Sequence, residues 1–212
     1  MNKNVVRRLL STIAAMAIAL AVAMGFASIA AQPVFAAVGN NFSFRLVPSP
    51  GVESCLAHNL PYGEVTVNDL GPVQNMHVEV FHLPGNEEFA LFVIQVPNKP
   101  FGLSWYQGDI DTNSAGHGVI DVTGIFSGDT FTVAPGVAPA PKLFPDDATS
   151  NNPQTDPVQI NHLGIWFGSP ENAAAAGCPD TVTPFESNHK AGIQVLNTGN
   201  YPETQGPLQK VP

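Results

Sequence analysis

The sequence predicts an all-β fold, an antiparallel β-sandwich of about eight strands with one short helix near residues 170–176. Two observations predict it. Short runs rich in Val, Ile, Phe and Thr follow one another along the chain, and Gly, Pro and Asn separate them, as is typical of strands joined by turns. Eight such runs with turn signals between most of them indicate a sandwich or a barrel.

Two of the runs have patterns that place them in the sheet. The eight candidate strands are 42–47, 64–69, 75–82, 89–96, 118–126, 129–134, 160–167 and 191–197. The run FALFVIQV at 89–96 has no polar alternation, which predicts a central strand buried on both faces. The run at 75–82 alternates, with His77 and Glu79 on one face and apolar residues on the other. The Pro-Gly-Asn turn at 84–86 predicts that these two runs pair as antiparallel neighbours.

The stretch GLSWYQGDIDTNSAGHG at 102–118 predicts a strand SWYQGDI, a turn TNSAG and a return strand that starts at Gly118. In this interpretation Gly116 supplies the positive φ that a tight turn requires. Trp105 and Tyr106 are adjacent, so on a strand their rings face opposite ways, and one can enter the core while the other meets solvent.

The same stretch also contains part of a calcium motif. Asp109, Asp111 and Asn113 match the first three ligand positions of an EF-hand loop. The match then fails, because Ser114 stands where Gly is required and Ile120 stands where a bidentate Glu is required. A calcium site of another geometry, with Asp109, Asp111 and Asn113 as ligands and the two aspartates on one strand face, is the alternative to a plain turn, and its cofactor would be Ca²⁺.

Carbohydrate binding is a second hypothesis for this region. An exposed aromatic ring near carboxylates can stack on a sugar, and Trp105, Tyr106 and Trp166 are the candidate rings. The competing interpretation is that the tryptophans fill the core of the sandwich.

One helix and one disulfide are predicted near the end of the chain. In SPENAAAAG, Ser169 can cap the helix, Pro170 suits its first position and Gly177 can end it in the left-handed conformation. Cys55 and Cys178 are the only two cysteines. In an oxidising compartment they predict a disulfide that links the start of the domain to this helix.

The first 36 residues predict a signal peptide. Lys3, Arg7 and Arg8 precede a long apolar run, and the small residues of a cleavage site end at Ala36, so we expect export and secretion with cleavage after Ala36. The alternative is an anchor, because the apolar run is long enough to cross a bilayer.

The mature chain, 37–212, is expected to be a single domain with a long irregular loop at 137–157. Its five Lys and Arg against 17 Asp and Glu give a net charge of −12. Such a surface repels phosphate backbones and anionic lipids, which excludes nucleic acid and membrane as partners after signal cleavage. A glycan or a protein at the cell surface is compatible with this charge.

Catalytic and transition-metal chemistry find little support in the sequence. Neither a G-x-S-x-G nor an H-E-x-x-H motif occurs, so no catalytic residue is assigned. The six histidines are spread along the chain, and a Cu or Zn site would need several of them to converge. The histidines are interpreted as surface or capping residues.

Three segments resemble a group of secreted bacterial proteins known only as hypothetical proteins: VQNMHVEVFHLPGNEEFALFVIQVPNKPFGLSWYQGDIDTNSAGHG, HLGIWFGSPENAAAAGCPDTVTPF and AGIQVLNTGNYPETQGPL. The resemblance implies export and a β-rich domain and implies no activity. The sequence pattern around the Leu-Pro-Gly turn also resembles that of immunoglobulin-like sandwiches in extracellular bacterial proteins. We therefore expect an exported, non-enzymatic binding or structural module; the alternative is a secreted metal-binding or carbohydrate-binding protein, and a hydrolase is less favoured.

Overall fold

The computed structural model describes residues 41–127, 130–133, 157–184 and 190–211. By its internal contacts the chain divides into Met1–Ala36 and Ala37–Pro212, and every described residue belongs to the second unit. The predicted signal peptide at 1–36 lies outside the described residues, as does the predicted loop at 137–157 except for Pro157. Among the described residues, no helix has both the length and the apolar character needed to span a bilayer.

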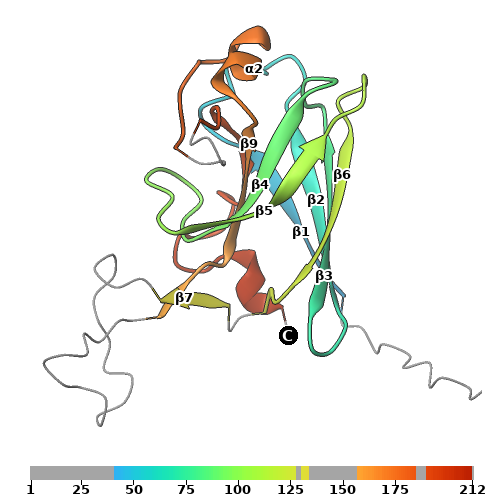
Figure 1. Cartoon of the computed structure of the whole chain (residues 1–212), viewed down its shortest axis with the longest axis vertical. Helices are drawn as coiled ribbons and strands as arrows, with labels where there is room; N and C mark the ends of the chain where they lie inside the picture. The colour runs from blue at the N-terminus through green and yellow to red at the C-terminus, as the bar shows by residue number, and fades with distance from the viewer. Residues whose placement is uncertain (1–40, 128–129, 134–156, 185–189, 212) are drawn as a thin grey trace, which may run out of the picture. The chain divides into compact units, whose positions relative to one another are not determined.

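The described residues form an all-β structure whose strands are antiparallel (Figure 1). The strands are β1 (Asn41–Pro48), β2 (Tyr62–Asp69), β3 (Gln74–Phe81), β4 (Glu88–Ile94), β5 (Ser104–Asp111), β6 (Gly118–Gly124), β7 (Phe131–Val133), β8 (Pro157–Gln159), β9 (His162–Phe167) and β10 (Gln194–Asn197). Eight of them form one sheet in the order β5-β4-β9-β10-β1-β2-β3-β6, and β7 pairs with β8. The predicted fold class is confirmed.

The eight-stranded sheet folds over on itself like a sandwich that is nearly a closed barrel. The sheet bends between β1 and β10, which pair only through Val47 and Pro48 at the end of β1. The half made of β1, β2, β3 and β6 then packs against the half made of β5, β4, β9 and β10. Both halves send apolar residues into one core, among them Leu46, Val78, Leu91, Ile110 and Ile165.

The strands β4, β9 and β10 of the second half are buried on both faces. Every residue of β9 and β10 is buried, and so is β4 after Glu88, which confirms the prediction for FALFVIQV. On the outer face, a separate apolar cluster covers these strands; its members are Ala90, Phe92, Ile94, Phe101, Trp166 and Ala191. This outer cluster explains why the strands lack polar alternation.

The predicted pairing of the 75–82 and 89–96 runs is wrong. β3 pairs with β2 and β6, whereas β4 pairs with β5 and β9, so the chain crosses from one half to the other between them. The crossing uses positive φ angles at His82 and Asn86. Thr112 fastens it, because its hydroxyl donates a hydrogen bond to the carbonyl of Pro84 over 2.7 Å.

The TNSAG turn also connects the two halves. Gly116 has φ 73°, as the sequence predicted, and Asn113 N–H donates to the carbonyl of His117 over 2.9 Å. The strands on its two sides, β5 and β6, stand at opposite ends of the strand order and diverge as they leave the turn (Figure 1). The turn therefore nearly closes the barrel without extending its hydrogen-bonded ladder.

The predicted helix is α2, Pro170–Ala175. Ser169 caps it by accepting a hydrogen bond from the backbone N–H of Asn172 over 3.1 Å, and Gly177 ends it with φ 81°. Cys178 follows at once and forms a disulfide with Cys55 across a Cα–Cα distance of 5.1 Å. The disulfide ties α2 to the segment that follows β1.

Candidate functional site

A bulge in β5 places Tyr106, Asp109 and Asp111, from the stretch 102–118, on one face. Residue pairing between β4 and β5 shifts at this point, with Leu91 opposite Gly108 and Phe92 opposite Tyr106, so Gln107 is the extra residue. Tyr106 and Asp109 are three residues apart and would lie on opposite faces of a regular strand. The bulge places both on the outer face, beside Phe92 and Ala90.

The two aromatic residues of β5 are both exposed. Trp105 lies opposite Val93, on the core side of the sheet, yet it is 60% exposed because β5 is an edge strand. Tyr106 is 43% exposed and packs edge-on against Phe92, with ring centroids 5.5 Å apart. The expectation that one of the two rings enters the core is therefore wrong.

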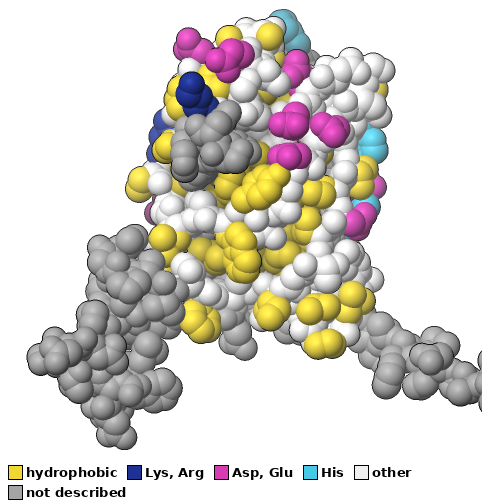
Figure 2. All heavy atoms as spheres, in the orientation of Figure 1, with side chains coloured by type: hydrophobic (Ala, Val, Ile, Leu, Met, Phe, Trp, Pro, Cys, Tyr) yellow, Lys and Arg dark blue, Asp and Glu magenta, His cyan; other side chains and the backbone are white. Residues whose placement is uncertain are grey.

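Three carboxylates continue the same outer face. Asp109 and Asp111 are exposed, and Asp111 lies directly opposite Glu88 on β4. Desolvation raises the pKa of Glu88, and the negative charges of Asp109 and Asp111 raise it further. Figure 2 shows acidic side chains gathered over β4 and β5, with hydrophobic side chains directly below them. We call Trp105, Tyr106, Asp109, Asp111 and Glu88 the β5 surface.

The third predicted calcium ligand does not join the carboxylates. The side-chain oxygen of Asn113 accepts hydrogen bonds from the backbone N–H groups of Ala115, over 2.9 Å, and His117, over 3.2 Å. It therefore stabilises the turn. Across the described residues, no group of three or more His, Cys, Asp or Glu side chains is arranged to hold a metal ion.

Trp166, the third candidate sugar-binding ring, is wrong as an exposed platform. It lies on β9 and is fully buried. Its ring makes edge contacts with Phe92 and Phe101, at centroid distances of 5.4 and 5.1 Å. It forms the centre of the outer apolar cluster and so supports the β5 surface from beneath through Phe92.

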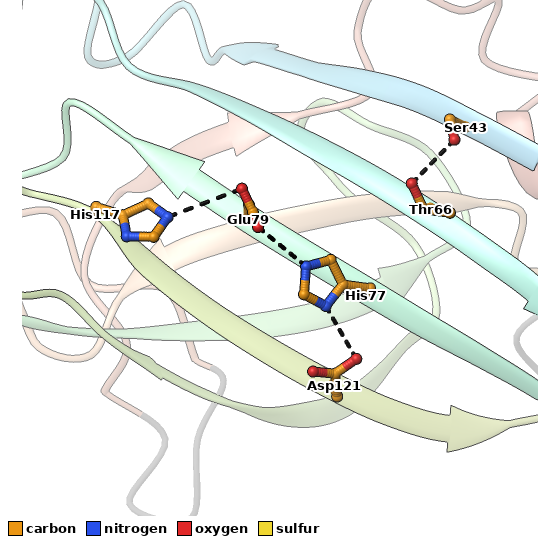
Figure 3. Close-up of polar contacts among 6 residues, drawn as sticks. All are labelled: Ser43, Thr66, His77, Glu79, His117 and Asp121. Atoms are coloured by element: carbon orange, nitrogen blue, oxygen red, sulfur yellow. Dashed lines mark hydrogen bonds and ion pairs between the residues drawn. The ribbon is translucent and has the colours of Figure 1, made fainter.

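A chain of histidines and carboxylates lies on the outer face of the other half of the sheet (Figure 3). His77 on β3 contacts two carboxylates: its Nδ1 lies 3.0 Å from Asp121 on β6 and its Nε2 lies 3.2 Å from Glu79. The second oxygen of Glu79 lies 3.9 Å from Nε2 of His117. Hydrogen bonding to Asp121, and then to Glu79, raises the pKa of His77.

This His77 cluster is unsuited to general base catalysis in the geometry seen. A general base needs a ring nitrogen that can accept a proton from a substrate, and carboxylates face both nitrogens of His77. The sequence pattern predicted His77 and Glu79 on one face but did not predict that Asp121 and His117 join them. The alternation of GVIDVTG would have shown that Asp121 faces outward, but only the β3–β6 register puts it opposite His77.

His162, the fifth histidine in chain order, is buried in the sheet, so its interpretation as a surface or capping residue is wrong. Its Nδ1 lies 2.7 Å from the hydroxyl of Thr198, and its Nε2 lies 3.1 Å from the carbonyl oxygen of Glu203. Burial lowers the pKa of His162. These contacts fix the start of β9 and leave the ring without access to a ligand.

Comparisons with protein-family models, with curated proteins and with solved structures found no match to this chain.

Proposed function

We propose that this protein is an exported, non-enzymatic binding module that recognises a neutral glycan at the β5 surface. The observation that carries the proposal is the 60% exposure of Trp105 on an edge strand. Large exposed aromatic side chains are costly in water and are enriched where proteins bind other molecules. Export rests on the signal peptide that the sequence predicts at residues 1–36.

The chemistry of the β5 surface suits a sugar. A pyranose has an apolar face of C–H groups that can lie against an aromatic ring, and its hydroxyls can donate hydrogen bonds to carboxylates. Tyr106 and Asp109 share the outer face of β5, and Trp105 projects from the opposite face of this edge strand, where it is exposed. One strand therefore offers both kinds of contact.

Charge selects among glycans. The predicted mature chain has a net charge of −12, and Asp109, Asp111 and Glu88 concentrate negative charge at this surface. An anionic polysaccharide would be repelled at long range and at the contact itself. Neutral sugars carry no such penalty, which makes them the favoured class.

Two observations favour binding over catalysis or metal chemistry. Carboxylates face both ring nitrogens of His77, so neither nitrogen is placed to accept a proton from a substrate. Within the part of the chain that the structure describes, side chains that could ligate a metal do not converge in groups of three. A chelator is therefore expected to leave both glycan binding and thermal stability unchanged.

A glycan array probed with the exported protein tests the proposal. Trp105→Ala and Tyr106→Ala should each reduce the signal on bound neutral glycans at least fivefold, because each removes a stacking ring. Asp109→Asn should reduce it less. Phe131→Ala is the matched control, since Phe131 is an aromatic residue of β7 that is 54% exposed; it should bind like the unaltered protein.

Two results would contradict the proposal. One is the absence of binding to any neutral glycan by a correctly folded protein. The other is binding that survives both Trp105→Ala and Tyr106→Ala, which would move the binding site away from β5.

A further inference from the structure

A pocket of about 390 Å³ lies beside the loop that joins β4 to β5. Its volume is within the range of pockets that hold small organic molecules, roughly 300–1,000 Å³. Four of its lining residues, Pro50, Gly51, Phe101 and Ile193, present apolar surface. The pocket shares no residue with the β5 surface, so it is a separate site.

The loop that forms one wall is held in place by buried hydrogen bonds. The carbonyl of Pro97 accepts hydrogen bonds from the side-chain amides of Gln194, over 3.1 Å, and Asn197, over 3.0 Å. Both amides come from β10 and are buried. The wall is thus anchored to the sheet, and little conformational entropy would be lost when a ligand binds.

Phe101 is held in an unusual conformation at the pocket wall. Its φ angle is 63°, in the left-handed region that non-glycine residues seldom occupy. Its N–H donates to the carbonyl of Asn98 over 2.8 Å, and its ring packs against Trp166. Such strain is kept where surrounding contacts enforce it, and it occurs often at ligand sites.

One cationic side chain, Lys99, lines this largely apolar pocket. Within residues 41–127, 130–133, 157–184 and 190–211, Lys99 forms no ion pair with a carboxylate. None of the described residues that line the pocket is acidic. The pocket therefore combines apolar walls with a positive charge that has no carboxylate partner among the described residues.

We propose that this pocket binds a small apolar carboxylate, such as a medium-chain fatty acid or an aromatic acid. The apolar part of the ligand would lie between Phe101 and Ile193, where it is removed from water. The carboxylate would face the Lys99 ammonium at the rim of the pocket. The ligand class follows from the pairing of one cation with apolar walls.

Titration of the full exported protein with octanoate and with its neutral analogue octanamide, followed by calorimetry, tests this proposal. Lys99→Gln should weaken octanoate binding about three- to fivefold, as expected for the loss of an exposed ion pair. The same change should leave octanamide binding unaltered. Lys210→Gln is the matched control, because it removes one equal charge outside the pocket, and it should change neither affinity.

A second variant tests whether the apolar walls bind the ligand. A side chain at Gly51 would start 2.6 Å from Cδ1 of Ile193, so Gly51→Val should fill the space between them and weaken both probes at least tenfold. If this variant does not fold, the unaltered protein is used instead. Adding octanoate should then change the amide chemical shifts of Lys99 and Ile193. The proposal is overturned if octanoate does not bind, if Lys99→Gln leaves octanoate affinity unchanged, or if octanoate leaves those shifts unmoved.

Discussion

The charge of His77 affects its hydrogen bonds directly, because the ring stands between Asp121 and Glu79. The imidazolium can donate one hydrogen bond to each carboxylate, whereas the neutral ring has a single N–H. These two hydrogen bonds raise the pKa of His77 above its usual 6.5. The protonated form is therefore the one that the folded protein favours.

We expect His77 to stabilise the fold at acidic pH and to lose this effect at alkaline pH. A raised folded-state pKa means that its contribution is complete below pH 6.5 and disappears as the pH rises through the folded-state pKa. His77→Gln should therefore lower the Tm by about 1–3 °C at pH 5.5 and have little effect at pH 8.5. Differential scanning calorimetry of both proteins across this range measures the difference.

The buried His162 has the opposite dependence and must be separated from His77. Because burial lowers its pKa, stability falls as the pH drops below 6.5, where the unfolded chain takes up a proton that the folded chain resists. His162 is common to both proteins, so it cancels from the difference between them. A difference in Tm that grows with increasing pH would contradict the role given to His77.

At the scale of elements, the bulge in β5 depends on Gly108. Its φ of 154° is disfavoured for other residues, and a Cβ atom there would lie 2.7 Å from Cδ1 of Ile120 on β6. The glycine therefore permits both the bulge and the close approach of β5 to β6. Without the bulge, Tyr106 would leave the face that Asp109 occupies.

Gly108→Ala should destabilise the protein by about 1–3 kcal/mol through backbone strain and the contact with Ile120. Chemical denaturation measures the loss in free energy of unfolding. Ile120→Val removes the Cδ1 atom, so the double variant should lose less than the two single variants added together. Strict additivity, or an unchanged stability of Gly108→Ala, would show that the contact carries no strain.

Features that depend on residues close together in the chain could be predicted from the sequence. The strand β4, the helix α2 and the turn at Gly116 are specified by neighbouring residues, and all three were predicted correctly. An isolated glycine within a strand is also a local signal of a bulge, so Gly108 could have been recognised. The bulge would then have placed Tyr106 and Asp109 on one face.

Strand pairing is decided over longer distances and was not predictable in the same way. His77 meets Asp121 only because β3 pairs with β6, and β4 pairs with β9 over a separation of more than 60 residues. The buried outer face illustrates the consequence. Trp166 could be assigned to the core or the surface only once Phe101, from a distant loop, was known to cover it.

At the scale of the whole molecule, the disulfide joins parts of the chain that are 123 residues apart. In the chain-entropy model, closing a loop of this length restricts the unfolded state by about 4–5 kcal/mol. The two cysteines lie in the segment after β1 and at the end of α2, where hydrogen-bonded strands do not hold the chain. The bond therefore fixes a helix that the sheet itself holds by few contacts.

We expect the double variant Cys55→Ala/Cys178→Ala to lose about 2–5 kcal/mol of unfolding free energy. For a domain of this size, the loss corresponds to a fall in Tm of about 5–15 °C. Reductant should lower the Tm of the unaltered protein by a similar amount and should not change that of the double variant, which serves as the control. The β5 surface lies on strands that remain paired without the disulfide, so glycan binding measured well below the Tm should persist. If reduction is complete by thiol titration and the Tm does not change, the disulfide does not stabilise the fold.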